Sequence, residues 1–181
     1  MRSNCRNYPF NSPNLDLYLK KILQISGILS WFNLIVWGLI VLLGLLGALL
    51  FQSFALLVFC FLLSVIVLHS YAALQLHKSI KNPAVPLSNQ TPVGIRLIGF
   101  VALFFGITCF INGFAMASNT REVAQFMQAQ VPQAKGLRID SLIGVIRAEG
   151  IFIFLCGLSI SLNVFLNFRL LRWYFFMKGM V

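Results

Sequence analysis

Few side chains in this chain could carry proton or ligand chemistry, and two of them lie inside long apolar stretches. His69 lies in the stretch 54–76, and Glu149 lies in the stretch 142–168. An imidazole can relay protons near neutral pH or ligate a metal or haem. A carboxylate inside a membrane helix can exchange protons against a transported solute. Both residues are therefore candidate intramembrane sites.

Each of these two candidates also has a structural interpretation. A haem held by two histidines needs a second histidine at the same depth on another helix, and His77 is the only other histidine in the chain. Haem binding would then require a dimer interface or another axial ligand. We therefore expect no cofactor and interpret His69 first as a partner in a hydrogen bond between helices. Glu149 lies near the end of its stretch, where water can reach it, and we expect it to pair with a nearby basic residue.

Other polar residues also fall within the apolar stretches. Counting from the charged ends predicts two polar layers. The inner layer contains Gln24, Asn33, His69, Ser70, Arg96, Asn163 and Asn167, and the outer layer contains Asn112, Arg147 and Glu149. Polar groups in a membrane cost free energy unless they find partners, so they are functional candidates by default. The asparagines are expected to join helices, each contributing about 0.6 kcal/mol.

Enzymatic chemistry is not supported by the remaining residue types. The chain has four acidic residues, two histidines and four cysteines, and none of them cluster. Cys5, Cys60, Cys109 and Cys156 stand singly, so a CxxC redox pair and a quinone-linked disulfide oxidase are excluded. Hydrolytic or transfer chemistry needs such groups gathered at one place. We predict no catalytic residue, no metal site and no enzyme.

The elements that must position these residues are membrane helices. Of 181 residues, 59% are hydrophobic and 10% are charged, and the mean hydropathy is +0.88. About 20 apolar residues of helix cross the hydrocarbon layer of a bilayer. The sequence predicts four spans, at 22–50, 54–76, 93–117 and 142–168. The expected fold is an all-α membrane protein with four transmembrane helices in an up-down bundle, formed by residues 1–181 as a single domain.

Basic residues predict the orientation of this bundle. Ten of the fourteen Lys and Arg residues fall in the tail 1–21, the loop 77–92 with the start of the third span, and the tail 169–181. The other four accompany three acids around the loop 118–141. Positive flanks are retained in the cytoplasm, so we expect both termini there, in a membrane that is most simply a prokaryotic inner membrane. The net charge of +10 is then a topological signal directed at membrane lipids, and we expect no nucleic-acid partner.

The connections carry two further expectations. Three prolines in 77–92 predict a stiff extended loop, which serves either as a spacer or as a docking site for a partner. In 118–141, Asn119 and Glu122 have the spacing of a capping box before a helical pattern that ends at Pro132. This pattern predicts a short amphipathic helix between the third and fourth spans, either resting among the headgroups or forming a lid.

Small residues predict where helices approach closely. Glycines recur at seven-residue steps in the third and fourth spans: Gly99, Gly106 and Gly113, and Gly150 and Gly157. In lipid, such positions let helix backbones come into contact. The seams serve either packing inside one bundle or a homo-oligomer.

Function itself is not encoded in any motif. The leading hypothesis is a non-catalytic membrane subunit or organiser that acts through helix and loop contacts with lipids, with other membrane proteins or with a second copy. The alternative is a small oligomeric transporter or channel that uses the intramembrane polar residues. Paired polar groups in a dry core would favour the first, and a continuous wet cavity that reaches His69 and Glu149 would favour the second.

Overall fold

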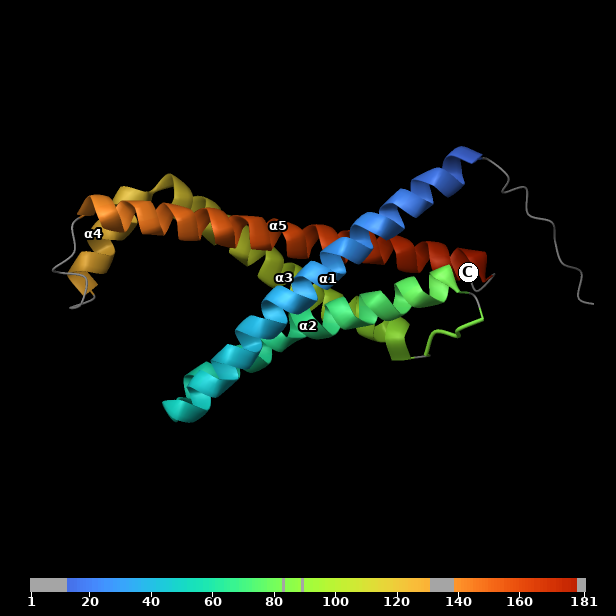
Figure 1. Ribbon diagram of the computed structural model, residues 1–181, viewed down its shortest axis with the longest axis horizontal. Coiled ribbons are helices and arrows are strands. Elements are labelled where there is room, and N and C mark those ends of the chain that lie inside the picture. The colour runs from blue at the N-terminus through green and yellow to red at the C-terminus, as the bar shows by residue number, and fades with distance from the viewer. Residues whose placement is uncertain (1–12, 83, 89, 131–138, 179–181) are drawn as a thin grey trace, which may run out of the picture.

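Five helices make up the described chain, and four of them are long and apolar enough to cross a membrane. The computed structural model describes residues 13–82, 84–88, 90–130 and 139–178, with side chains from Leu17 onward. The helices are α1 (Pro13–Leu50), α2 (Phe54–Lys81), α3 (Gln90–Ser118), α4 (Thr120–Gln130) and α5 (Ile139–Met177) (Figure 1). The predicted all-α membrane fold, with a short helix before the last span, is confirmed.

The helices are longer than the predicted spans. α2 continues through His77 to Lys81, and α3 starts at Gln90, so the expected loop 77–92 shortens to about half its length. Pro92 lies in the first turn of α3, where its missing N–H would have no helical partner in any case. α1 and α5 have 38 and 39 residues, or about 57 Å of helix at 1.5 Å per residue. Both therefore extend past a hydrocarbon layer of roughly 30 Å or cross it at a tilt.

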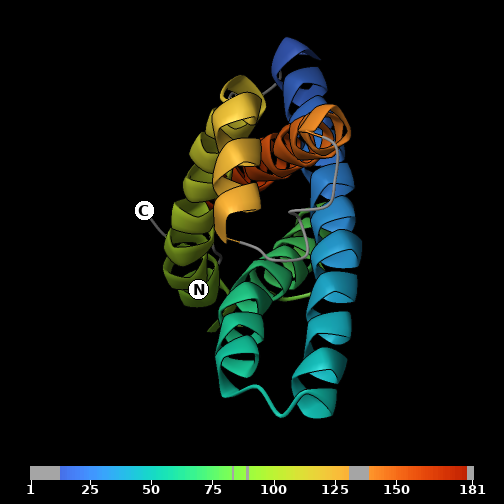
Figure 2. The same cartoon turned by 90° about the vertical axis from the view of Figure 1, so that its left-hand side faces the viewer.

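The four long helices form two antiparallel pairs that meet at one end and diverge at the other. In Figure 1, α3 and α5 run side by side, while α1 and α2 cross them and continue away from α4. Figure 2 shows the turn between α1 and α2 well apart from α4. In that turn Gln52 has a positive φ of 48°, and the Ser53 hydroxyl accepts a hydrogen bond from Leu56 N at 3.3 Å.

A seam of glycines joins α3 to α5. A Cβ placed on Gly113 would lie 2.7 Å from Phe154 Cα and 2.8 Å from Gly150 O, and one on Gly150 would lie 2.7 Å from Ala117 N. Gly157 faces Gly106 O and Phe110 in the same way. All five glycines of the two seven-residue series therefore pack against helices of their own chain. Four of them, all except Gly99, bring the α3 and α5 backbones into direct contact.

Buried apolar side chains gather where the two pairs meet. One cluster contains Ile22 and Leu23 of α1, Leu76 of α2, Ile95 of α3, and Leu170, Leu171 and Tyr174 of α5. A second cluster surrounds Trp37, Ile66 and Ile160, and a third joins Ala124 of α4 to Leu142 and Ile146 of α5. Beyond Trp37, the segment 38–62 buries little besides Ala48 and Cys60. We call this segment the free arm.

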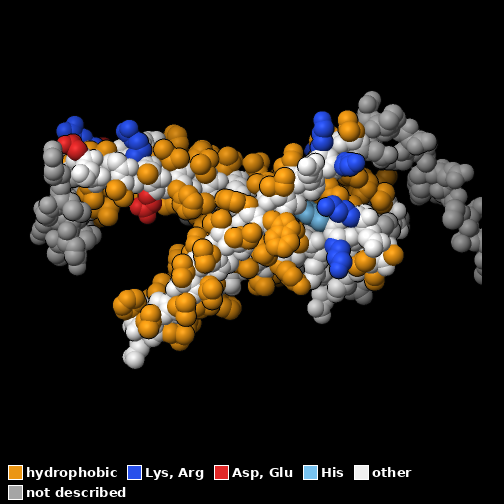
Figure 3. Space-filling model, in the orientation of Figure 1, with side chains coloured by type: hydrophobic (Ala, Val, Ile, Leu, Met, Phe, Trp, Pro, Cys, Tyr) orange, Lys and Arg blue, Asp and Glu red, His pale blue; other side chains and the backbone are white. Residues whose placement is uncertain are grey.

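Charged side chains occupy the two ends of the molecule. We call the end where the two pairs meet the basic end. Eight basic residues lie there: Lys20, Lys21, Lys78, Lys81, Arg96, Arg169, Arg172 and Lys178. Glu122, Asp140 and Glu149 belong to α4 and the start of α5, at the opposite end. Figure 3 shows hydrophobic side chains over the middle and over the free arm, with blue side chains at both ends and red ones at one end only.

Changing Gly157 to Ala should destabilise the α3–α5 pair, because the new Cβ would meet backbone atoms that cannot move aside. We expect a loss of about 1–3 kcal/mol in the free energy of unfolding, measured by detergent-denaturant titration followed by circular dichroism. Gly144→Ala in the same helix is the matched control, because nothing lies within 4 Å of its Cβ position. Equal effects from the two substitutions would contradict the seam.

Candidate polar site between the helix pairs

Three serine–asparagine rungs connect α1 to α5. On α1, Ser26, Ser30 and Asn33 follow one another at steps of four and three residues, so they share a face. On α5, Ser159, Asn163 and Asn167 follow at steps of four and share a face in the same way. The two helices are antiparallel, so the first residue of one set meets the last residue of the other. We call these six residues the ladder.

Every rung is closed by a hydrogen bond. Ser26 Oγ donates to Asn167 Oδ1 at 3.0 Å, and Ser30 Oγ donates to Asn163 Oδ1 at 2.9 Å. The third rung reverses the order of residue types: Ser159 Oγ donates to Asn33 Oδ1 at 3.1 Å. The Asn33 amide donates to the Ser159 carbonyl oxygen at 3.4 Å.

Two of the rungs are also linked along α5. Asn167 Nδ2 donates to the Asn163 backbone oxygen at 2.8 Å and to Asn163 Oδ1 at 2.9 Å. Asn163 Oδ1 therefore accepts from both Ser30 and Asn167 and is the junction of the network. Ladder residues are at most 8% exposed, and Ser26, Ser30, Asn33 and Asn167 are fully buried. Buried networks of this kind are stable only when their members are satisfied.

His77 brings α2 into the network. Its Nε2 lies 3.1 Å from Asn167 Oδ1 and 3.1 Å from Ser26 Oγ. An amide oxygen only accepts, so Nε2 carries the proton and donates to Asn167. The ring is 4% exposed, and it turns Nδ1 towards Gly27 of α1. This network thus joins three of the four long helices near the basic end, and Thr91 of α3 donates separately to Gln75 Oε1 of α2 at 3.2 Å.

His69, the sharpest candidate from the sequence, is not part of the ladder. It is 1% exposed, and neither of its ring nitrogens has a hydrogen-bond partner among the described residues. Its Cε1 lies 3.0 Å from the position of a Cβ on Gly99, where the Phe168 ring also packs. The expected hydrogen bond from His69 to another helix is therefore absent from the described structure.

The other polar residues predicted as intramembrane sites lie in different parts of the structure. Asn33 and Asn163 lie in adjacent parts of the ladder, whereas Arg147 and Glu149 are exposed on α5 near α4. Asn112 is exposed and donates only to Thr108 O of its own helix, at 2.8 Å. Of the predicted inner layer, therefore, only the asparagines join the ladder, and the predicted outer residues do not form a network in the described chain.

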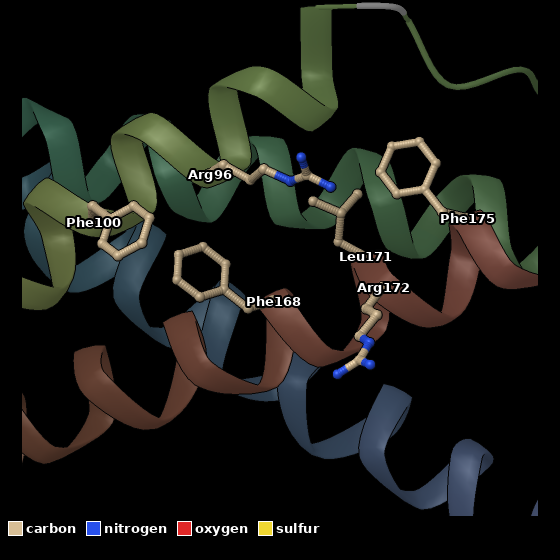
Figure 4. A pocket seen from close by; sticks show the side chains of 6 residues that line it. All are labelled: Arg96, Phe100, Phe168, Leu171, Arg172 and Phe175. Atoms are coloured by element: carbon tan, nitrogen blue, oxygen red, sulfur yellow. The ribbon is translucent and has the colours of Figure 1, made fainter. Parts of the chain in front are cut away.

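Arg96 lies at the basic end, on the rim of an apolar pocket between α3 and α5 (Figure 4). Its guanidinium carbon is 5.4 Å from the centroid of the Phe175 ring, which is a cation–π distance. Phe100 and Phe168 line the same pocket, and Arg172 points to its other side. The charge is held at the surface by an aromatic ring rather than by an acid.

The sequence predicted the three asparagines of the ladder, Asn33, Asn163 and Asn167, as inner polar residues, but not its three serines. A serine in an apolar helix is a weak signal because its hydroxyl can bond to a backbone oxygen one turn earlier, as Ser70 does with Ile66 O at 2.9 Å. The usable signal was the spacing: Ser26 and Ser30 precede Asn33 on one face, and Ser159 precedes two asparagines on another.

The groups of the ladder are bonded to one another. The ladder contains hydroxyls and amides, with one imidazole, and no acid or thiol joins it. Among the described residues, no three His, Cys, Asp or Glu side chains come close enough to hold a metal ion. Comparison with protein families, with characterised proteins and with solved structures finds no match to this chain.

Ser30 and Asn163 offer a direct test of the ladder. We expect Asn163→Ala to lower the free energy of unfolding by about 1–2 kcal/mol, because the buried Ser30 hydroxyl loses its acceptor and Asn167 keeps only the backbone oxygen of residue 163. A double-mutant cycle with Ser30→Ala should give a coupling energy of about 0.6 kcal/mol. The measurement is unfolding in mixed micelles, with Asn112→Ala as the control. Strictly additive effects would show that the rung contributes nothing.

Proposed function

We propose that this chain is a non-catalytic integral membrane protein, a subunit or organiser that works through contacts made inside the bilayer. The free arm is the observation that carries the proposal. Leu50, Phe51, Phe54 and Phe61 are 73–80% exposed, and no other helix of the described chain covers them. A helix pair that projects from its own bundle offers a surface to another membrane protein or to a second copy.

The state of the core supports this proposal over transport. The polar side chains between the helix pairs are bonded to each other in the ladder, which leaves few groups to bind a moving solute. The pockets at the basic end and beside Trp37 are lined by neither His69 nor Glu149. A transport pathway would have to join those two residues across most of the membrane.

One observation favours the alternative of a small oligomeric transporter. His69 is a buried imidazole without a hydrogen-bond partner in the described part of the chain, and such a group is available to a proton or a ligand. In that reading, a second copy would complete the pathway.

We further propose that the basic end faces the cytoplasm, most simply that of a prokaryote. It carries the excess of Lys and Arg that retains a flank on that side during insertion. Reporter enzymes fused to each terminus should then both be active in the cytoplasm, and activity in opposite compartments would refute the arrangement.

Photo-crosslinking in living cells tests the proposed function. A photoreactive amino acid at Leu46 or Phe61 on the free arm should yield a discrete protein adduct, identifiable by mass spectrometry. The same amino acid at Phe104 of α3 is the matched control, because this side chain is 69% exposed but lies on the paired part of the bundle. Purified protein in liposomes should be inactive as a proton or solute carrier. The proposal would be overturned in favour of transport if the arm gave no adducts and the liposomes showed a proton or solute flux that His69→Leu abolishes.

A further inference from the structure

The groove between α1 and α2 at the basic end has a charged rim and an apolar interior. Its volume is about 910 Å³, within the range of roughly 300–1,000 Å³ common for ligand sites. Lys20, Lys78 and Lys81 lie at the rim, Gln24 and His77 lie next, and Trp31 lies deepest along α1. Figure 3 shows a small visible part of a histidine next to basic side chains at this end.

This order of residues matches an amphiphile. From Lys20 to Trp31 the helix rises about 16 Å, which is close to half of a hydrocarbon layer of roughly 30 Å. The groove therefore grades from positive to apolar over the depth of one leaflet. A soluble phosphate would use only the rim, whereas a phospholipid would use the whole length.

Nothing described at this end neutralises the lysines. Glu122, Asp140 and Glu149 belong to the opposite end, and Asp16 lies outside the described side chains. Arg96, Arg169 and Lys178 rest against aromatic rings, at 5.1–5.4 Å from the ring centroids. Among the described side chains the lysines of the groove have no acidic partner, and they would hold an external anion as point charges.

The wall of the groove is also kept open and rigid. Gly27 leaves space above the His77 ring, since a Cβ there would lie 3.6 Å from Nδ1. His77 itself is fixed by its bonds to Asn167 and Ser26, so its Nδ1 is presented to the groove at a set position. Trp31 is 56% exposed and offers an aromatic ring at a depth that only an acyl chain reaches.

We propose that this groove binds one anionic phospholipid of the adjoining leaflet. The phosphate lies among Lys20, Lys78 and Lys81, and an acyl chain lies along Trp31. This binding site is independent of the protein contacts of the free arm and would hold for an organiser or a transporter alike.

Native mass spectrometry of the full chain in mild detergent tests the site, with dioleoylphosphatidylglycerol and dioleoylphosphatidylcholine as probes. We expect the anionic lipid to bind at least tenfold more tightly than the zwitterionic one. Lys20→Gln with Lys78→Gln should weaken binding about thirtyfold, because each lysine near an anionic headgroup contributes roughly fivefold. Lys21→Gln with Lys178→Gln removes the same charge from the same end outside the groove, and it should change binding less than about threefold.

Two further variants separate the groove from diffuse attraction. Gly27→Leu fills the groove without changing its charge and should reduce lipid binding, while circular dichroism reports whether the fold is kept. Trp31→Ala alters an exposed side chain and should weaken the binding of the lipid but not the binding of free glycerol phosphate. Any one of four results would overturn the proposal. These are equal losses of binding from the two lysine pairs, equal affinity for both lipids, undiminished lipid binding by Gly27→Leu, and displacement of the lipid by glycerol phosphate at a similar concentration.

Discussion

The hydrogen bonds between α1 and α5 are the constraint on which the rest of the structure depends. In lipid, apolar surfaces have little tendency to join helices, so a bundle needs close packing or polar contacts. The ladder supplies the polar contacts: Asn163 Oδ1 accepts from both Ser30 and Asn167, and Asn33 pairs with Ser159. Because His77 adds α2 to the same network, the two helix pairs are joined near the basic end. Thr91 of α3 adds a hydrogen bond to Gln75 of α2 at the same end, and away from that end the pairs diverge.

Two kinds of contact therefore hold the helices together, one within a pair and one between the pairs. Inside the α3–α5 pair, glycines such as Gly113 and Gly157 let backbones touch along the whole interface. Between the pairs, a short polar network sets one position and one register, since each hydroxyl needs its own amide partner. The divergence leaves the free arm uncovered, which is the basis of the proposed contacts with membrane partners. The same convergence at the other end creates the lysine-rich groove between α1 and α2.

The sequence was sufficient for the architecture and less so for the site. Length and hydropathy predicted four spans, and the capping-box spacing at Asn119 predicted the helix that begins at Thr120. The loop 77–92 was predicted too long, because proline is tolerated in a first helical turn and Pro92 occupies one. The sequence predicted the depth of Asn33, Asn163 and Asn167 but not their serine partners, because which face of α1 meets α5 depends on tertiary packing. The same reason explains why the surroundings of His69 were not predicted, because no local pattern reveals its burial beside Gly99.

The central claim, that the ladder joins α1 to α5 within a single chain, is tested most directly by disulfide trapping in native membranes. Ser30→Cys and Asn163→Cys would be combined in a chain whose four native cysteines are replaced. Since the two native side chains lie 2.9 Å apart, mild oxidation should protect both new thiols from a maleimide-linked polymer while the chain remains a monomer on a non-reducing gel. Thiols that stay reactive, or a disulfide-linked dimer in place of the monomer, would contradict the account.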